Sequence, residues 1–309
     1  MNMADLTGSS GRKALIFYLM IWGAATAYLA ARGADWSFPI ASLVIFGCGF
    51  SALGWLMTRR MEAPALPVVN AKRESLALLA YLAFYAVVFF GWLYGLLKEA
   101  VLPGPAQEMA VLSFKLVVHI GLPIVVLLLV GGKIRDMWDL GLDRRGFWLA
   151  LAVLSAFCLA LLAVVSPALS QISGLKIAPV ATVLWVGGAW LWVSLEAGLP
   201  EEFLFRAGLQ SRLASWMQSP TAAIIVTSLI FALCHAPGIW LRGTPDTDGF
   251  STNPLQVVAF TIASLSPLSI ALGVLWARTR SLLLIVVVHG AIDALPFTAE
   301  FVRLWGSAY

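Results

Sequence analysis

The sequence predicts an all-α, polytopic membrane protein: a bundle of about eight to nine transmembrane helices. Of the 309 residues, 61% are hydrophobic and only 12% are charged, whereas an ordinary soluble domain is about 45–50% apolar and about 25% charged. The mean hydropathy is +0.90, and the apolar runs lack the two-residue alternation of membrane strands. Together these observations exclude a water-soluble globular domain and a disordered chain.

Nine apolar runs are each long enough to cross about 30 Å of hydrocarbon at about 1.5 Å per residue. The first follows a short polar segment and is long enough to remain as a spanning helix. The last two runs are separated only by Arg278-Thr279-Arg280, which leaves almost no loop. In order, the predicted spans are residues 14–31, 36–58, 74–97, 111–132, 147–169, 180–213, 220–241, 255–279 and 281–302.

The distribution of basic residues predicts the orientation. With the N-terminus in the cytoplasm and nine alternating spans, most of the 20 Lys and Arg residues fall in the inside segments, as the positive-inside rule requires. The Ala- and Arg-rich composition and the lack of an organelle-targeting signal favour the bacterial inner membrane. The lipid bilayer is the expected partner. The small net charge of +4 gives no indication of nucleic-acid binding, and the oligomeric state stays open.

The two halves of the chain differ in the polar residues within their spans. We expect an N-terminal region, residues 1–145, with about four spans and few intramembrane charges, and a second region, residues 146–309, that contains the site. Charged groups are costly in lipid, so each one in a span is a candidate functional residue. Those in the second region are Glu196, Glu201, Glu202, Arg206, His235, His289 and Asp293.

Three of the predicted helices each carry a pair of motif residues at helical spacing, and each pair includes a charged or titratable side chain. Glu202 and Arg206 share a helix face at i,i+4, while Glu201 points about 100° away from Glu202. The alternative is an interfacial charge cluster at a helix end. Phe231 and His235, and likewise His289 and Asp293, are also spaced i,i+4. A structural histidine in the first pair, and a hydrogen-bonded pair that only ties helices together in the second, are the corresponding alternatives.

Carboxylates and histidines of this kind predict hydrolytic chemistry. Counted from the cytoplasmic helix ends, Glu201, His235 and His289 reach comparable depths in the membrane. The carboxylates outnumber the cations, so the site needs either a divalent metal or protonated carboxylates, and both options stay open. Zn²⁺ accepts His and carboxylate ligands and activates a bound water. The zincin pattern HExxH is absent, as are the rhomboid and intramembrane aspartyl protease patterns.

The three motifs, in this order and on separate hydrophobic helices, resemble those of the CPBP family. This family comprises the CAAX-prenyl proteases and bacteriocin-processing enzymes, also called Abi proteins. The motifs are Glu-Glu-x-x-x-Arg, Phe-x-x-x-His and His-x-x-x-Asn/Asp, and the resemblance covers about residues 180–300. The third motif ends in Asp293, where the prenyl-protease branch typically has Asn, so the prenyl-protease branch is less well supported than the family.

The resemblance implies an intramembrane metal-dependent endopeptidase that hydrolyses a peptide bond in a membrane-associated peptide or lipidated protein, of CAAX or bacteriocin type. The implied catalytic residues are Glu201, Glu202, His235, His289 and Asp293. Arg206 and Phe231 would support the site structurally. The implied cofactor is a divalent metal, expected to be Zn²⁺, with Glu202, His235 and His289 as its ligands.

Two other functions compete with the peptidase. A non-catalytic membrane scaffold, chaperone or immunity protein of the same fold would keep the helices and act by binding alone. A proton- or ion-coupled transporter would use Glu and His as a relay. Transporters often have matching broken helices in both halves, whereas here the polar residues gather in the second half.

Overall fold

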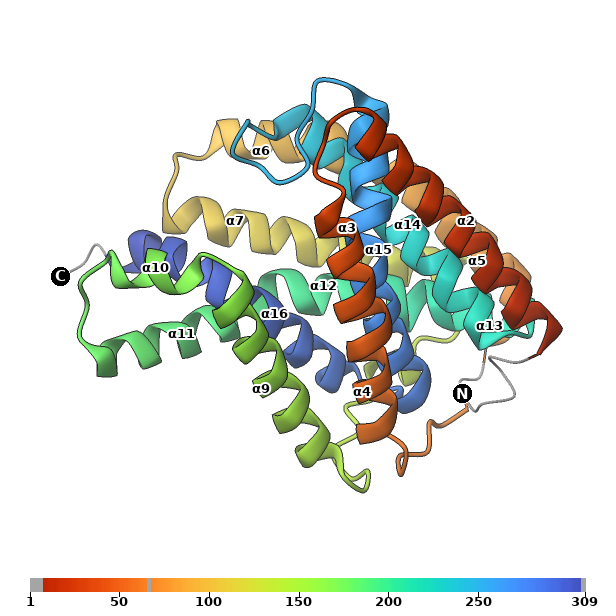
Figure 1. Ribbon diagram of the computed structural model, residues 1–309. Coiled ribbons are helices and arrows are strands. Elements are labelled where there is room, and N and C mark those ends of the chain that lie inside the picture. Colours follow the sequence, from red (N-terminus) through yellow and green to blue (C-terminus); the bar gives the residue numbers. More distant parts are fainter. Residues whose placement is uncertain (1–7, 66–67, 307–309) are drawn as a thin grey trace.

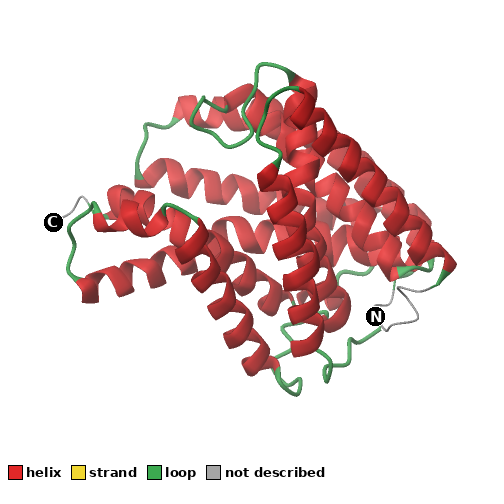
Figure 2. Ribbon diagram, in the orientation of Figure 1, coloured by secondary structure: helices red, strands yellow, loops and turns green. Residues whose placement is uncertain are grey.

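The described residues of the computed structural model, 8–65 and 68–306, form helices joined by short loops and contain no strand (Figure 2). Nine helices in this part of the chain are long and apolar enough to cross a membrane. The prediction of a multi-pass helical bundle is therefore confirmed. The nine spans are Ser9–Ala31, Ser37–Met57, Ala71–Ala100, Pro105–Leu129, Phe147–Val165, Pro179–Met217, Pro220–Arg242, Pro254–Thr279 and Leu282–Trp305.

Several spans are continuous helices whose hydrogen bonding changes from α to π and back. Such π segments are rare and are found mostly at functional sites. The single-element spans are α2 (Ser9–Ala31), α9 (Phe147–Val165), α14 (Pro220–Arg242), α15 (Pro254–Thr279) and α16 (Leu282–Trp305). The composite ones are α3 (Ser37–Ser42), η1 (Leu43–Phe50) and α4 (Ser51–Met57); α5 (Ala71–Phe84), η2 (Tyr85–Leu93) and α6 (Tyr94–Ala100); and α7 (Pro105–Leu116), η3 (Val117–Gly121) and α8 (Leu122–Leu129).

The sixth span is the longest and carries both candidate glutamates. It runs through α11 (Pro179–Val193), η5 (Ser194–Gly198), α12 (Leu199–Glu201), η6 (Glu202–Gln210) and α13 (Ser211–Met217). Its 39 residues exceed the roughly 20 that one crossing needs. Outside the spans lie only the short helices η4 (Arg135–Trp138) and α10 (Ala168–Ser173) among the described residues.

The starts of the helices follow from local sequence signals. Asn70, Ser219, Asn253 and Ser281 each accept a backbone N–H bond at the start of α5, α14, α15 and α16, which satisfies one of the free donors there. Proline occupies the first turn of α7, α11, α14 and α15, where its missing N–H costs nothing.

The last two spans are separate helices despite the minimal loop between them. Arg280 adopts a left-handed backbone conformation with φ 50°, and its N–H bonds the Trp276 carbonyl at 2.8 Å. The Ser281 hydroxyl donates to the Leu140 carbonyl at 2.5 Å and accepts from the backbone N–H of Leu284 at 3.1 Å. The turn therefore needs only two residues, which explains why the sequence shows almost no loop there.

The C-terminal spans form the centre of the bundle and the N-terminal ones its lipid-facing periphery. The α14, α15 and α16 helices are largely buried, whereas α2 and the α3–α4 span are mostly exposed (Figure 1). The C-terminal and the N-terminal spans have similar hydropathy, because a residue in a bilayer can face either protein or lipid without leaving apolar surroundings. Two of the helices that carry the candidate site, α14 and α16, belong to this centre, and the sixth span contributes its η6 segment, whose residues are all buried.

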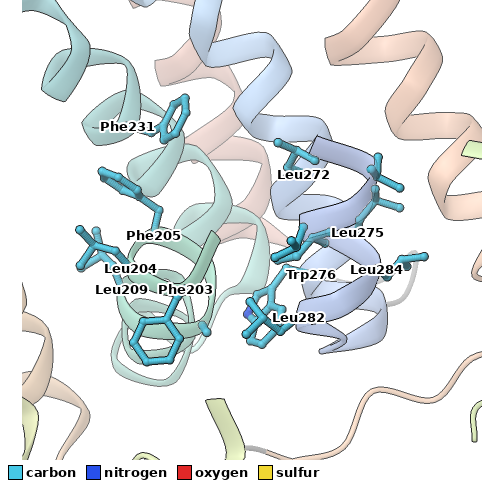
Figure 3. Packing of buried hydrophobic residues seen from close by; sticks show 14 of the residues in the cluster. Phe203, Leu204, Phe205, Leu209, Phe231, Leu272, Leu275, Trp276, Leu282 and Leu284 are labelled. Atoms are coloured by element: carbon cyan, nitrogen blue, oxygen red, sulfur yellow. The ribbon is translucent and has the colours of Figure 1, made fainter. Parts of the chain in front are cut away.

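A buried apolar cluster surrounds η6 and holds it in place. Figure 3 labels members of this cluster on four elements: Phe203, Leu204, Phe205 and Leu209 of η6, Phe231 of α14, Leu272, Leu275 and Trp276 of α15, and Leu282 and Leu284 of α16. The indole N–H of Trp276 also donates to the Ser211 hydroxyl at 3.0 Å. Side chains packed on all sides fix the rotation of η6, and with it the directions of Glu202 and Arg206.

Candidate functional site

Glu201 and Glu202 point to different surroundings. Glu202, the first residue of η6, is fully buried, and Glu201, the last residue of α12, has a side chain 12% exposed. Consecutive residues on a helix diverge by about 100°, so only one of the two carboxylates can enter the packed interior. Glu201 is therefore the carboxylate with access to water or a substrate.

The Glu202 carboxylate belongs to a buried ionic group. Its Oε1 lies 3.1 Å from Nη1 of Arg206, and both side chains are 0% exposed. Arg206 also donates from Nη2 to the Ser269 hydroxyl of α15 at 3.0 Å, and its guanidinium carbon lies 4.6 Å from the centre of the Phe231 ring. A buried charge is tolerated when it is paired and hydrogen-bonded in this way.

The imidazole of His289 bridges the two glutamates and Asp293. Nδ1 of His289 lies 2.7 Å from Glu202 Oε1, and Nε2 lies 3.3 Å from Asp293 Oδ2 and 4.0 Å from Glu201 Oε2. Carboxylate oxygens only accept hydrogen bonds, so the doubly protonated ring is the form that donates on both sides. In this form His289 presents a cationic N–H beside Glu201.

His235 approaches Glu201 from the other helix, α14. Its Nδ1 lies 2.8 Å from the Phe231 carbonyl, which only accepts, so Nδ1 carries the proton and the neutral ring keeps a free lone pair on Nε2. Nε2 faces Glu201 Oε2 at 4.0 Å. The Phe231 ring packs against His235 with their centres 4.5 Å apart. Phe231 thus lies between the guanidinium of Arg206 and the imidazole.

The Glu201 carboxylate is consequently the centre of the arrangement. Its Oε2 lies 4.0 Å from Nε2 of both His235 and His289. Both separations are too long for a direct hydrogen bond and leave room for a bridging water. Exposure increases outward, from 8% for the His289 side chain to 29% for His235 and 42% for Asp293. The group is therefore reached along the His235 and Asp293 side.

The predicted metal ligands do not form a metal site. Within the ranges that the structure describes, no group of three or more His, Cys, Asp or Glu side chains could hold a metal ion. Glu202 of the expected set is enclosed, and its Oε1 contacts Arg206 and His289 instead. Two ligands of a tetrahedral Zn²⁺ lie about 3.4 Å apart, so the 4.0 Å gaps around Glu201 are also too wide as they stand.

Two glycines let the helices that carry these residues approach closely. A Cβ on Gly290, the neighbour of His289, would overlap the Ser194 hydroxyl and lie 3.0 Å from Ser194 Cα. A Cβ on Gly198 would lie 2.8 Å from the carbonyl oxygen of Val286. Small residues at such crossings allow membrane helices to pack backbone to backbone. Neither glycine was predicted from the sequence, although Gly290 directly follows His289 of the third motif.

A second group of polar side chains includes residues for which the sequence predicted no role. Lys115 forms an ion pair with Glu196, with side chains 11% and 17% exposed. The next turn carries His119, whose Nδ1 lies 3.0 Å from the Lys115 carbonyl and whose Nε2 lies 2.7 Å from the Tyr85 hydroxyl. Lys115 therefore points inward and neutralises Glu196. Ser269 and Tyr85 had no sequence signal, because lone hydroxyl residues are common in membrane helices.

Comparison with known families gives a match over the part of the chain that contains these residues. A sequence profile described as Rce1-like, type II CAAX prenyl endopeptidase Rce1-like, matches residues 183–295. The match includes Glu201, Glu202, Arg206 and the residues of the other two motifs. Searches among curated proteins and among solved structures give no match.

Proposed function

We propose that this multi-pass membrane protein is an intramembrane endopeptidase, because residues 183–295 match the profile of Rce1-like type II CAAX prenyl endopeptidases. The observation that carries the proposal is the position of Glu201, whose Oε2 lies 4.0 Å from the Nε2 atoms of two histidines on two other helices. A base and a second polar group on opposite sides of one water are what peptide hydrolysis requires.

Glu201 and His235 are the proposed general bases. A water between them donates one proton to Glu201 Oε2 or to the free Nε2 of His235, and its oxygen attacks the carbonyl carbon of the scissile peptide bond. When the C–N bond breaks, the same group returns the proton to the leaving amine nitrogen. General-base catalysis of this kind contributes about 10²–10⁴-fold to the rate.

His289 is the proposed stabiliser of the oxyanion. Its Nε2–H lies beside Asp293 and would have to be shared with the oxyanion, and a donor shared in this way would lower the energy of the negatively charged tetrahedral intermediate by up to about 3–4 kcal/mol. Glu202 would hold the ring through Nδ1, Arg206 would hold Glu202, and Asp293 would set the position of Nε2–H. Each of the five predicted catalytic residues thus receives a proposed role, with Glu201 and His235 sharing that of general base.

The proposed substrate is a membrane-associated or lipidated peptide, of CAAX or bacteriocin type. Its support is that the residues around Glu201 lie within membrane-spanning helices and are reached from the side of His235 and Asp293. The N-terminus is proposed to lie in the cytoplasm of a bacterial cell, with the site accessible from that side.

The expected Zn²⁺ stays a prediction, and the steps above use side chains only. Metal analysis of the purified protein tests it directly. A metal held by His235 and His289, the two histidines of the predicted ligand set, would be retained at about one per chain and lost in H235A. Absence of metal from an active preparation would remove the cofactor from the proposal and leave the side-chain mechanism in place.

The decisive experiment replaces Glu201 by Gln in the full chain, reconstituted in nanodiscs with a panel of lipidated CAAX-type and bacteriocin-type peptides. We expect cleavage to fall by about 10²–10⁴-fold. Glu300→Gln, an exposed change on α16, is the matched control and should keep the wild-type rate. Equal rates for E201Q and the control would contradict the mechanism. If the biological activity survives E201Q and no peptide is cleaved, the scaffold or immunity function is supported instead.

A further inference from the structure

A basic cavity that contains none of the residues of the Glu201 group lies where the second span ends and the fifth begins. It has a volume of about 350 Å³ and opens between the C-terminus of α4 and the N-terminus of α9, two helices that contact each other (Figure 1). Three arginines, Arg59, Arg60 and Arg145, line it together with apolar residues, namely Leu56, Met57 and Leu149. We call these six residues the α4–α9 cavity.

The arginines of the α4–α9 cavity have no acidic partner among the described residues. All three are exposed, and none forms an ion pair with a described residue. The neighbouring Arg144, in contrast, is paired with Asp139. No carboxylate lines the cavity. Three unpaired guanidinium groups around one hollow favour an anion with several oxygens, because arginine binds phosphate in a bidentate manner.

The backbone at the start of α9 also favours an anion in the α4–α9 cavity. The first turn of α9 has no acidic residue, and its N-cap Gly146, with φ 85°, lines the cavity and offers no side-chain cap. The free N–H groups at the start of this 19-residue helix therefore carry partial positive charge beside the arginines.

The position and the walls of the cavity indicate a lipid rather than a free anion. Leu56 and Leu149 are 42% and 64% exposed, and each belongs to a membrane-spanning helix within a few residues of its end. Trp148 beside them is 64% exposed, which is typical of the bilayer interface. A ligand here meets guanidinium groups on one side and lipid-facing apolar side chains on the other.

We propose that the α4–α9 cavity binds the headgroup of an anionic phospholipid. Arg59, Arg60 and Arg145 contact the phosphodiester, and the acyl chains run along Leu56, Met57 and Leu149. A phosphatidylcholine headgroup is disfavoured, because its choline cation would lie among three arginines without a carboxylate to receive it. The proposal is independent of the peptidase activity, since none of these residues contacts the Glu201 group.

The test measures binding of dioleoylphosphatidylglycerol to the full chain in detergent, by native mass spectrometry and by the shift of the unfolding temperature. Dioleoylphosphatidylcholine and inorganic phosphate are the comparison probes. We expect retention and stabilisation with phosphatidylglycerol only. In R59Q/R60Q/R145Q the affinity should fall about a hundredfold, since each arginine near a membrane surface contributes roughly fivefold. R145Q alone should lose about fivefold, which keeps the test valid if the triple variant does not fold.

R12Q/K72Q/R73Q is the matched control, because it removes the same charge from exposed residues on the same predicted membrane side. It should retain wild-type binding. Equal losses in the control and in R59Q/R60Q/R145Q would show non-specific attraction to basic surface and overturn the proposal. Unchanged binding in the triple variant would overturn it as well, and so would a response to inorganic phosphate equal to that of the lipid.

Discussion

Gly290→Ala tests whether close approach of two helix backbones assembles the site. The added Cβ would overlap the Ser194 hydroxyl and lie 3.0 Å from both Cα and Cβ of Ser194. Non-bonded carbon atoms prefer about 3.5–4.0 Å. The Ser194 side chain can rotate away, but its Cα and Cβ cannot, so α16 and η5 must separate by about 0.5–1 Å.

The separation of α16 from η5 affects both the stability of the protein and the rate of peptide cleavage. Overpacking of this kind costs about 1–3 kcal/mol in the free energy of unfolding. His289 follows α16, so its 2.7 Å contact with Glu202 lengthens toward or beyond the limit of a hydrogen bond. A displacement of about 1 Å in a catalytic group costs about 10²-fold in rate. We therefore expect G290A to lower peptide cleavage by roughly 10- to 100-fold.

The assay compares the unfolding midpoint and the cleavage rate of G290A with those of Gly187→Ala. Gly187 lies in α11 with no atom within 4 Å of the position of a Cβ, and alanine stabilises a helix by up to about 1 kcal/mol relative to glycine. S194A/G290A removes the overlapping hydroxyl and should recover part of both losses. If G290A matches G187A in stability and rate, close approach at Gly290 does not position His289.

Three further variants test the polar groups. Arg206→Gln removes the guanidinium beside the buried Glu202 carboxylate and leaves only His289 to neutralise it, so it should cost about 3–5 kcal/mol of unfolding free energy in chemical denaturation. E202Q/R206Q should cost clearly less, and equal costs would refute the pairing. Lys115→Met should lower the free energy of unfolding by about 1–3 kcal/mol, because it leaves the Glu196 carboxylate without its partner. K115M/E196M should recover most of this loss, and no recovery would argue against an ion pair in the membrane. Phe231→Leu keeps an apolar side chain but removes the aromatic ring that contacts both Arg206 and His235. We expect kcat to fall about three- to tenfold with KM nearly unchanged. An unaltered kcat would show that the ring only fills space.

The number and type of the helices were predictable because hydropathy and length are local properties. Each of the nine apolar runs corresponds to one span in the described part of the chain. The i,i+4 contact of Glu202 with Arg206 follows from helix periodicity alone. The two-residue turn at Arg280 was less predictable, because a left-handed conformation at arginine leaves no sequence signal.

The arrangement of the candidate site depended on contacts between distant segments. Helical spacing indicated that Glu201 and Glu202 diverge, but it could not say which of them enters the interior. Glu202 contacts Arg206 and His289, and among the described residues the three expected metal ligands are not grouped as a metal site. Lys115 could have extended outward to the interface, and only the position of Glu196 on a neighbouring span draws it inward.

The amino-acid sequence alone therefore determined a membrane-embedded helical chain with three polar motifs and a recognisable family domain. Tertiary structure decided which carboxylate is accessible, which histidine nitrogen faces it, and how closely Gly198 and Gly290 let the helices approach. The physical reason is that apolar residues have nearly the same transfer free energy whether they face lipid or protein. Hydropathy consequently places a helix in the membrane but leaves its rotation and its neighbours to side-chain packing.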